Sequence, residues 1–455
     1  MKTKIQQGDG DLTSGAVWKA ILAFASPLLV GNLLQQLYNL TDSVIVGYFL
    51  GKEALAAVSA SFFIYYFIIS LMIGIGSGIT VVVSHHCGAR QYTQVQRAFS
   101  SFFIFAWWAG IALSCAGMIF AEAFFRLTGT PEEVMPCAVS YFRTYIGGTF
   151  LFVIFNSMLS ILRGMGDSTR PMLFVLATAV LNVALDLLFI AVLKQGVEGA
   201  AFATILAQGG GLAIALAYVH RRHPLLSLRR KDMIFDRKMF VRGLKIGLPT
   251  SVQQCAMAAG LMALLGTVNS FGTDTLTAYG AAGKIDTLVT QAILTFAGAL
   301  AAFCGQNIGA QRLDRVRSGV RFAIRMNLAF CSVTFGLILF FGKDMMRMFT
   351  TDRAVIDIGY EYLLATGSFL VVNGMLNILT GALRGAGDTV FAMITGIATF
   401  WLARIPLAFF LSNVWGRNGI WWAINISIAL GFIATGIYYK TERWKKRQVT
   451  DRMTE

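Results

Sequence analysis

Two aspartates stand in long apolar stretches of the sequence, where burying a charged side chain costs at least ~2.5–3.5 kcal/mol on insertion scales. Asp42 follows Gln35 and Asn39 at i, i+4 and i+7 spacing, so the three share one face of a helix. Asp186 follows Asn182 at i+4 spacing in a second stretch. Two carboxylates that meet in a low dielectric cannot both stay ionised cheaply, so a proton or Na⁺ can bind there.

Thr204 adds a hydroxyl oxygen at a similar depth. Along the helices, Asp186 lies ~22 Å from one end of its apolar stretch and Thr204 ~10 Å from the opposite end. In a ~30 Å bilayer core these depths agree. Asp42 reaches this depth only if its helix is tilted, bent at Pro27 or begins deeper in the cytosol. The sequence therefore predicts a cation-coupling site of Asp42, Asn182, Asp186 and Thr204. The alternative is that the aspartates only hydrogen-bond to neighbouring helices.

Further polar side chains in the apolar stretches are candidates for lining a substrate cavity. These are Gln35, Asn39, Tyr141, Asn156, Gln253, Asn373, Asn377 and Arg404. Tyr141 and Asn156 recur 221 residues later as Tyr362 and Asn377, so packing explains them at least as well. Arg404 is either a salt-bridge partner across a cleft or a residue that extends its charged end to the membrane surface.

The chain repeats itself after 221 residues, which indicates how these side chains are positioned. The segment LRGMGD at 162–167 recurs as LRGAGD at 383–388. A long period with a constant offset indicates two large homologous halves. Each half holds six apolar runs of about 20 residues, the length that crosses a bilayer. We expect an all-α polytopic membrane protein, with twelve transmembrane helices in two six-helix lobes related by pseudo-two-fold symmetry.

Composition and charge support this organisation. Hydrophobic residues make up 56% of the 455 residues and charged residues 13%, about half the charged share of soluble proteins. We expect six-helix lobes at 16–219 and 241–440, a terminal segment at 1–15, a basic linker at 220–240 and a basic tail at 441–455. Most of the 38 Lys and Arg residues fall on the side shared by the linker and both termini, so we expect both termini in the cytoplasm.

Several functional classes are disfavoured. The net charge of +15 follows from this topology, and the basic clusters lack interleaved aromatics, so no nucleic-acid partner is expected. The sequence has no nucleophile or metal motif such as HExxH or GxSxG, so we expect neither enzyme activity nor a cofactor. Adjacent side chains in His85-His86-Cys87 point in different directions on a helix. We expect no metal other than Na⁺ at the aspartate site.

The repeated LRGxGD segment is expected to be structural. Its arginine would lie near the negative end of a helix dipole, and its glycines can adopt the left-handed conformation that ends helices. A phosphate-binding loop would require Lys followed by Ser or Thr after the last glycine. Neither copy has that pair.

The two halves differ at the candidate cation site. The repeat offset places Asp42 opposite Ala263 or Leu264, Asn182 opposite Ala403, Asp186 opposite Leu407, and Thr204, aligned through Gly199 and Gly419, opposite Ile424. All the counterparts are apolar. If these polar residues served the fold that both lobes share, the second lobe would need polar residues at the same positions. The asymmetry therefore predicts a cation site in the N-terminal lobe alone.

In combination, several segments resemble the multidrug and toxic compound extrusion (MATE) transporters. They are Pro27, YNLTD at 38–42 with Gly47, GAR at 88–90, LRGMGD at 162–167, LNVALD at 181–186 and RIPL at 404–407, within a repeat that covers residues 12–440. The resemblance implies a secondary active antiporter that exports amphipathic, often cationic drugs or toxic organic compounds in exchange for Na⁺ or H⁺ by alternating access. It also implies an N-lobe cation site at Asp42, Asn182, Asp186 and Thr204.

Branches of this family differ in which lobe holds the essential acids. The seventh span offers Gln253 and Gln254 but no carboxylate, and the interior of the tenth offers only Asn373 and Asn377. The chain therefore resembles the N-lobe-coupled prokaryotic branch, which implies the cell membrane of a bacterium or archaeon. We expect a small-molecule substrate, a lipid bilayer around the chain, and a monomer, because the duplicated lobes already form a cleft.

The alternative function is a flippase for lipid-linked oligosaccharide or another lipid of the same superfamily. Such a protein would need a cavity rich in Arg or Lys to hold a pyrophosphate. Among the candidate cavity residues Arg404 is the one basic side chain, which disfavours the flippase.

Overall fold

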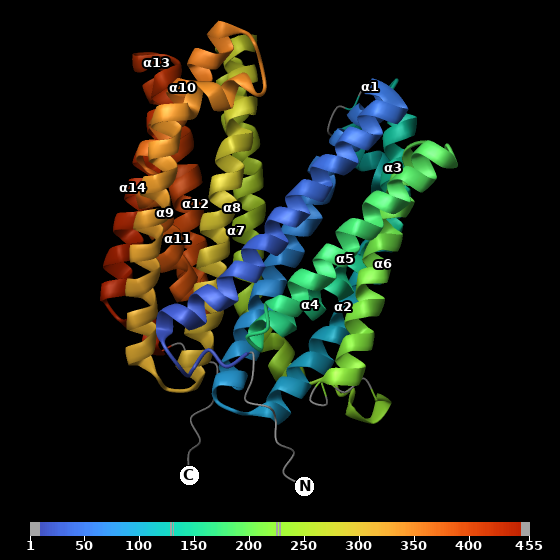
Figure 1. The fold of residues 1–455 in the computed structure, drawn as a ribbon, viewed down its shortest axis with the longest axis vertical. Coiled ribbons are helices and arrows are strands. Elements are labelled where there is room, and N and C mark those ends of the chain that lie inside the picture. Colours follow the sequence, from blue (N-terminus) through green and yellow to red (C-terminus); the bar gives the residue numbers. More distant parts are fainter. Residues whose placement is uncertain (1–9, 128–129, 131, 224–225, 227–228, 447–455) are drawn as a thin grey trace. The chain divides into compact units, whose positions relative to one another are not determined.

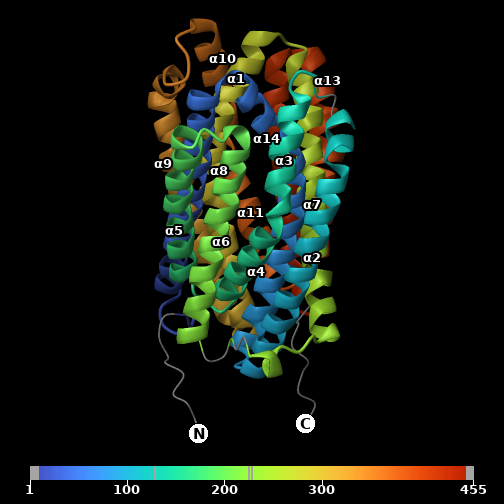
Figure 2. The ribbon, with the colours of Figure 1, turned by 90° about the vertical axis from the view of Figure 1, so that its right-hand side faces the viewer.

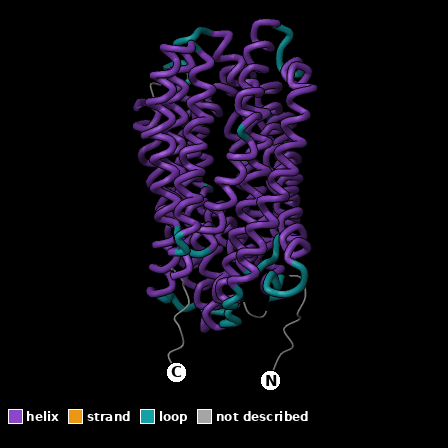
Figure 3. The backbone as a smooth tube through the Cα atoms, turned by 90° about the vertical axis from the view of Figure 1, so that its left-hand side faces the viewer, coloured by secondary structure: helices purple, strands orange, loops and turns teal. Residues whose placement is uncertain are grey.

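Helix is the only regular secondary structure in the part of the chain that the structure describes. The computed structural model describes residues 10–127, 130, 132–223, 226 and 229–446. Helices make up 89% of the structure. Figure 3 shows helices and loops, with no strand in the described residues. The predicted all-α fold is confirmed. The first nine residues, part of the basic linker and the end of the basic tail lie outside the described residues.

The chain forms two compact units whose boundaries cross the sequence repeat (Figure 1). Unit 1 comprises Met1–Asp11 and Ser26–Gly247, and unit 2 comprises Leu12–Ala25 and Leu248–Glu455. The units differ from the expected lobes at 16–219 and 241–440, because each includes a short segment that leads into the first helix of the other half.

Polar side chains of unit 2 hold the backbone that precedes the first helix of the chain. The Leu12 amide donates to Gln306 Oε1 at 3.0 Å, and Asn307 Nδ2 donates to the Leu12 carbonyl at 3.1 Å. Arg315 donates to the Gly15 carbonyl at 2.8 Å. Backbone groups ahead of a helix need such partners when they are buried, so these contacts fix where the first helix starts.

The matching segment of the second half is held in unit 1. Ser100 Oγ donates to the Asp232 carbonyl at 3.0 Å, and the Asp236 amide donates to Ser101 Oγ at 2.8 Å. Arg97 lies 3.7 Å from the Asp236 carboxylate. The start of the first helix of each half is therefore anchored by polar side chains of the other half.

Unit 1 carries most helices of the first half (Figure 2). They are α1 (Val17–Gly88), which belongs to this unit from Ser26 onward, α2 (Tyr92–Leu127), α3 (Met135–Gly147), α4 (Thr149–Gly164), α5 (Thr169–Asp186), the π-helix η1 (Leu187–Val192), α6 (Gly196–Arg222) and the short 3₁₀ helix η2 (Arg230–Asp232). α1 is two helices joined at Gly51, where φ is 83°. The first half therefore supplies six apolar segments, as expected.

Unit 2 carries the corresponding helices of the second half. They are α7 (Arg237–Asn269), which belongs to this unit from Leu248 onward, α8 (Thr273–Gly309), α9 (Leu313–Arg347), α10 (Arg353–Ser368), α11 (Leu370–Gly385), α12 (Thr389–Ile397), the π-helix η3 (Ala398–Arg404), α13 (Ile405–Trp415), α14 (Arg417–Lys440) and the 3₁₀ helix η4 (Arg443–Lys446).

The described helices give up to twelve membrane spans. Ten are long and apolar enough to cross a bilayer, with the two parts of α1 counted separately. Two further spans are bent pairs, α3 with α4 at 46° and α10 with α11 at 50°. The bends lie at Gly148 and Phe369, which the 221-residue repeat relates to each other. Bent fourth and tenth spans are therefore a feature of both halves.

The LRGxGD segments end one helix and begin the next in both halves. Gly166 and Gly387 take φ values of 88° and 85°, a conformation that glycine adopts without steric cost. Asp167 Oδ1 then accepts from the Arg170 amide at 3.0 Å, while Asp388 accepts from the Tyr438 hydroxyl at 2.5 Å. The structural role expected for this segment is the one observed.

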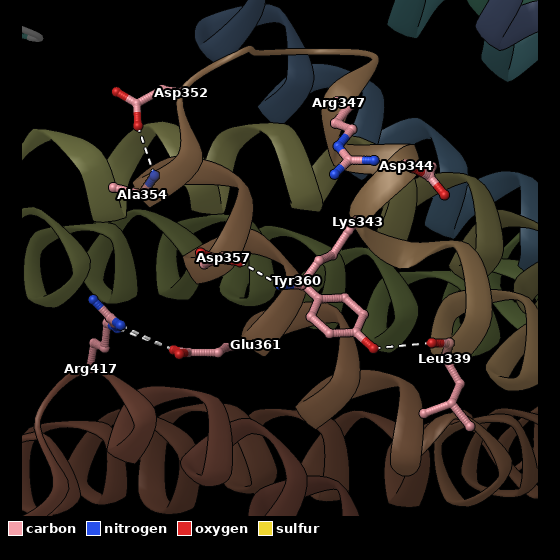
Figure 4. A network of polar contacts seen from close by, with 10 residues as sticks. All are labelled: Leu339, Lys343, Asp344, Arg347, Asp352, Ala354, Asp357, Tyr360, Glu361 and Arg417. Carbon is pink, nitrogen blue, oxygen red and sulfur yellow. Dashed lines mark hydrogen bonds and ion pairs between the residues drawn. The ribbon is translucent and has the colours of Figure 1, made fainter.

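Exposed polar contacts order the connection between α9 and α10 (Figure 4). Lys343 lies 2.7 Å from Asp357, and Arg417 lies 3.2 Å from Glu361. Asp352 caps α10 by accepting from the Ala354 amide at 2.8 Å. Exposed ion pairs stabilise a fold by about 0–1 kcal/mol each, so this network fixes a loop and adds little to overall stability.

Gly78→Ala is expected to destabilise unit 1. A Cβ atom at Gly78 would lie 2.4 Å from the Gly243 carbonyl oxygen and 2.7 Å from the Gly247 nitrogen, so the backbones of α1 and α7 must separate. Overpacking of this kind costs about 1–3 kcal/mol. Thermal unfolding in detergent should show a drop of several degrees in Tm. Gly266→Ala, where nothing lies within 4 Å, is the control, and an equal drop in both variants would contradict the account.

Candidate cation site

Three helices of unit 1 supply the four candidate cation-coupling residues. Asp42 lies on α1, Asn182 and Asp186 lie in the last part of α5, and Thr204 lies on α6. α5 packs against α6, and Figure 2 shows the two side by side. Asp186 is the last residue of α5 before the π-helix η1. π-helical turns are often found at functional sites because they shift the side chains that follow.

The two aspartates lie within electrostatic reach of each other. Asp186 is fully buried, and neither of its oxygens has a hydrogen-bond partner in the described part of the chain. The same holds for Asp42 Oδ1. A buried carboxylate without a partner is strongly destabilising, so this pair requires a proton or a metal cation.

Asn182 and Thr204 form a second contact beside the aspartates. Asn182 Nδ2 donates to Thr204 Oγ1 at 3.4 Å, and Thr204 Oγ1 donates to the Ala200 carbonyl at 3.1 Å. Both side chains are buried. Asn182 Oδ1 has no partner among the described residues. With its NH₂ group occupied by Thr204, the amide can offer this oxygen to a cation one helical turn from Asp186.

Tyrosines surround the aspartate pair. Tyr38 and Tyr141 both lie within electrostatic reach of Asp42 and Asp186. Tyr145 stacks on Tyr141 with ring centroids 5.9 Å apart. Tyr141 was predicted as a cavity residue, but Tyr38 and Tyr145 were missed. Their helical spacing could have indicated them. Tyr38 precedes Asp42 by one helical turn and Tyr145 follows Tyr141 by one turn, so each pair lies on one helix face.

The other cavity candidates of unit 1 do not join this cluster. Gln35 interacts with Tyr38, at its edge. Asn39 is exposed. Asn156 Nδ2 donates to the Phe152 carbonyl of its own helix at 3.0 Å.

The cavity candidates of unit 2 make local contacts. Gln253 Oε1 accepts from Arg384 at 2.7 Å, and Asn377 Nδ2 donates to Asn373 Oδ1 at 3.0 Å. Arg404 Nε donates to Ser427 Oγ at 3.1 Å, so the Arg404 side chain is directed into unit 2 and does not extend to the membrane surface.

One carboxylate in unit 2 escaped the sequence reasoning. Asp286 lies half-buried on α8, within electrostatic reach of Arg404 and Tyr362. Asp286 stands neither opposite one of the four candidate residues nor in the seventh or tenth span. Its signal in the sequence was a carboxylate within an apolar stretch, the same signal that indicated Asp42 and Asp186.

Thr204→Val is expected to weaken cation binding moderately. The valine keeps the shape but removes the oxygen that holds the Asn182 amide. A neutral hydrogen bond is worth about 0.5–1.5 kcal/mol, so the cation concentration for half-maximal transport should rise about 2–10-fold. Thr204→Ser keeps the oxygen and should behave like the wild type. Equal values for Thr204→Val and wild type would exclude Thr204 from the site.

Comparison with known proteins places the chain in a family. The profile of the MatE family matches residues 27–188 and again 249–410, so the two matches begin and end 222 residues apart. The chain is 30% identical to the probable multidrug resistance protein YpnP of Bacillus subtilis, over 96% of this chain and 97% of that protein. It is 26% identical to the probable multidrug resistance protein NorM of Thermotoga maritima, over 95% and 94% of the two chains.

Solved structures of transporters share the fold. A MOP superfamily transporter from Pyrococcus furiosus superposes with a TM-score of 0.89 and 25% identity, over 96% of this chain and 98% of that one. A multidrug resistance MATE family transporter in an outward-facing conformation gives the same values.

Proposed function

Because the chain belongs to the MatE family of multi-pass membrane transporters, we propose that it is a secondary active antiporter that exports amphipathic, often cationic drugs or toxic organic compounds in exchange for Na⁺ or H⁺. Relatives named as multidrug resistance proteins support the substrate class. The observation that carries the cation half of the proposal is the pair of half-buried Asp42 and fully buried Asp186, which has no basic hydrogen-bond partner within the described residues.

Exchange requires that the cation and the organic substrate favour different states of the protein. A cation that enters between the two carboxylates draws α1 and α5 together, because Asp42 and Asp186 come from these two helices. Without it, the two negative charges repel each other and α1 is released. A conformational change is driven only by such a difference in affinity between states. Alternating access then follows if the organic substrate binds best while the aspartates are cation-free.

Asn182, Thr204 and Tyr141 have supporting roles in this proposal. The amide and hydroxyl oxygens complete a set of hard ligands that suits Na⁺, and the same carboxylates accept a proton in its place. Tyr141 lies within electrostatic reach of both aspartates. Its hydroxyl group can donate a hydrogen bond to a carboxylate when the pair is charged. The site needs no cofactor and works within one chain, which fits a monomer.

The topology and location are also part of the proposal. The Lys and Arg residues concentrate on the side of the linker and of both chain ends, which places these in the cytoplasm by the positive-inside rule. The membrane would be the cell membrane of a bacterium or archaeon. Export from the cytoplasm against a concentration gradient would then use the inward gradient of Na⁺ or protons.

Transport in membrane vesicles tests the function. Inverted vesicles that contain the protein receive either a Na⁺ gradient or a pH gradient, and movement of ethidium is followed by fluorescence. We expect one of the two gradients to drive transport, and that gradient identifies the coupling ion. If neither gradient drives transport of ethidium or of several other organic cations, the antiporter proposal fails and the lipid-linked flippase becomes the better account.

A further inference from the structure

Unit 1 contains a cavity of about 450 Å³ where α2 and α3 lie together, here called the α2–α3 cavity. Glu122 of α2 lines one side, and a face of α3 lines the other. The α3 residues have the i, i+3, i+4, i+7 and i+8 spacing of a single helical face. They include Pro136, Val139, Ser140, Arg143 and Thr144. None of them belongs to the candidate cation site.

The second half offers an internal comparison, because the repeat places α2 opposite α9 and α3 opposite α10. With the 221-residue offset, the start of α2 at Tyr92 falls on the start of α9 at Leu313, and the end of α3 at Gly147 falls on the end of α10 at Ser368. The same offset pairs three residues of the cavity wall with residues of unit 2. These pairs are Glu122 with Lys343, Pro136 with Asp357, and Val139 with Tyr360.

Unit 2 fills the equivalent place with its own side chains. Lys343 lies 2.7 Å from Asp357, and its ammonium group lies over the Tyr360 ring, 5.5 Å from the centroid. The Tyr360 hydroxyl donates to the Leu339 carbonyl at 3.0 Å (Figure 4). In unit 1 a valine replaces this ring, and Glu122 stands opposite a proline, which cannot form an ion pair. The side chains that fill the place in unit 2 therefore have no counterpart in unit 1.

The α2–α3 cavity presents one acid and one base. Arg143 is exposed and forms no ion pair within the described residues. Its counterpart in the repeat is Leu364, so the shared fold does not require a charge there. Glu122 accepts from Arg126 at 2.7 Å through Oε1, and its second oxygen can accept from a ligand.

The depth of Arg143 in the membrane favours a phosphate as its partner. α3 begins the outer part of a bent span at Met135, and Arg143 lies ~12 Å further along the helix. The headgroup region is only about 5–8 Å deep on each side of the hydrocarbon core. An exposed arginine below it is costly unless its side chain extends back toward the surface and finds a partner. Helical side chains tilt toward the N-terminus, which directs this guanidinium toward the headgroups.

Apolar side chains flank the α2–α3 cavity. Ile119, Phe120 and Leu127 of α2, on either side of Glu122 in the sequence, are exposed. Exposed apolar surface of this kind marks contact with a membrane. A ligand that enters the cavity from this surface would carry hydrocarbon chains beside a polar group.

We propose that the α2–α3 cavity binds the headgroup of a zwitterionic phospholipid that carries a primary ammonium group. The phosphodiester accepts hydrogen bonds from the Arg143 guanidinium and the Thr144 hydroxyl, and the ammonium group donates to Glu122. One acid and one base suit a zwitterion better than an anionic lipid. A quaternary ammonium has no N–H to donate, so phosphatidylethanolamine is preferred to phosphatidylcholine. This inference does not depend on the proposed transport function.

The test measures binding of radiolabelled phosphatidylethanolamine to the purified, delipidated full chain in detergent. We expect saturable binding of about one lipid per chain. Arg143→Gln should weaken it about 10–100-fold, the range for losing a charged hydrogen bond. The control is Lys194→Gln, which removes the same charge at an exposed residue outside the cavity and should leave binding unchanged. Equal binding by wild type and folded Arg143→Gln would overturn the proposal.

Other ligands establish which chemistry the cavity recognises. Phosphatidylglycerol and phosphatidylcholine should bind about tenfold more weakly or worse, since each lacks the ammonium hydrogen bonds. Equal binding of all three lipids would mean non-specific contact with the bilayer and would contradict a headgroup site. Glycerophosphoethanolamine should not displace the lipid at equal concentration. If it does, the cavity takes a soluble phosphate ester, and the lipid assignment is wrong.

A second set of variants covers the case in which Arg143→Gln does not fold. Val139→Tyr introduces the ring of Tyr360, and Glu122→Lys with Pro136→Asp introduces the ion pair of Lys343 and Asp357. Both changes copy side chains that unit 2 accommodates at the equivalent place. We expect each variant to fold, as judged by thermal unfolding, and to lose phosphatidylethanolamine binding. Wild-type binding in either folded variant would exclude the α2–α3 cavity as the lipid site.

Discussion

Asp42→Asn is expected to abolish cation-driven export while the protein stays folded. Asparagine has nearly the shape of aspartate, but it neither takes up a proton nor offers an anionic oxygen to Na⁺. Because Asp42 and Asp186 lie within electrostatic reach of each other, loss of one carboxylate removes the site. Coupling between two ligands is typically worth about 5–150-fold in affinity, so gradient-driven efflux from proteoliposomes should fall by about that factor.

The control for Asp42→Asn is Thr41→Val. Thr41 is the preceding residue on α1, and its hydroxyl donates to the Leu37 carbonyl of the same helix at 2.9 Å. The valine keeps the shape and charge of this position, so efflux should stay near the wild-type rate. Size-exclusion chromatography and thermal unfolding establish that both variants are folded. Wild-type efflux in folded Asp42→Asn protein would exclude Asp42 from the coupling site.

Asp186→Asn is expected to have an equally large effect, and the double variant with Asp42→Asn should be no worse than either single one. Residues that act as a unit are strongly non-additive. If the carboxylates share one cation, either substitution removes the same binding event. We expect the three variants to agree within about twofold in efflux rate. Losses that multiply in the double variant would mean that the aspartates act separately.

Much of the fold could be predicted because it follows from hydropathy and repetition. Apolar runs of bilayer length and the LRGxGD repeat predict two sets of six helices, and the structure has them. The bends at Gly148 and Phe369 were not predicted, because the apolar pattern continues through both. The contacts of Leu12 with Gln306 and Asn307 could not be predicted from the sequence either, since they join residues 294 and 295 positions apart.

The candidate site, like the fold, could be predicted only in part from the sequence. Helical spacing and depth suggested that Asn182, Asp186 and Thr204 lie together, and the structure places them on adjacent helices. Asp42 fitted the depth estimate poorly, yet it lies within electrostatic reach of Asp186. The π-helices η1 and η3 were not predicted. A π-helix depends on small shifts in backbone hydrogen bonds, which composition and periodicity do not reveal.

Linked equilibrium binding tests the central claim, that one cation site at Asp42 and Asp186 opposes substrate binding. The affinity of purified protein for ethidium is measured while Na⁺ concentration and pH are varied, in wild type and in Asp42→Asn. We predict that one of the two cations weakens ethidium binding by about 5–150-fold in the wild type and leaves it unchanged in Asp42→Asn. The same cation dependence in both proteins would contradict the claim.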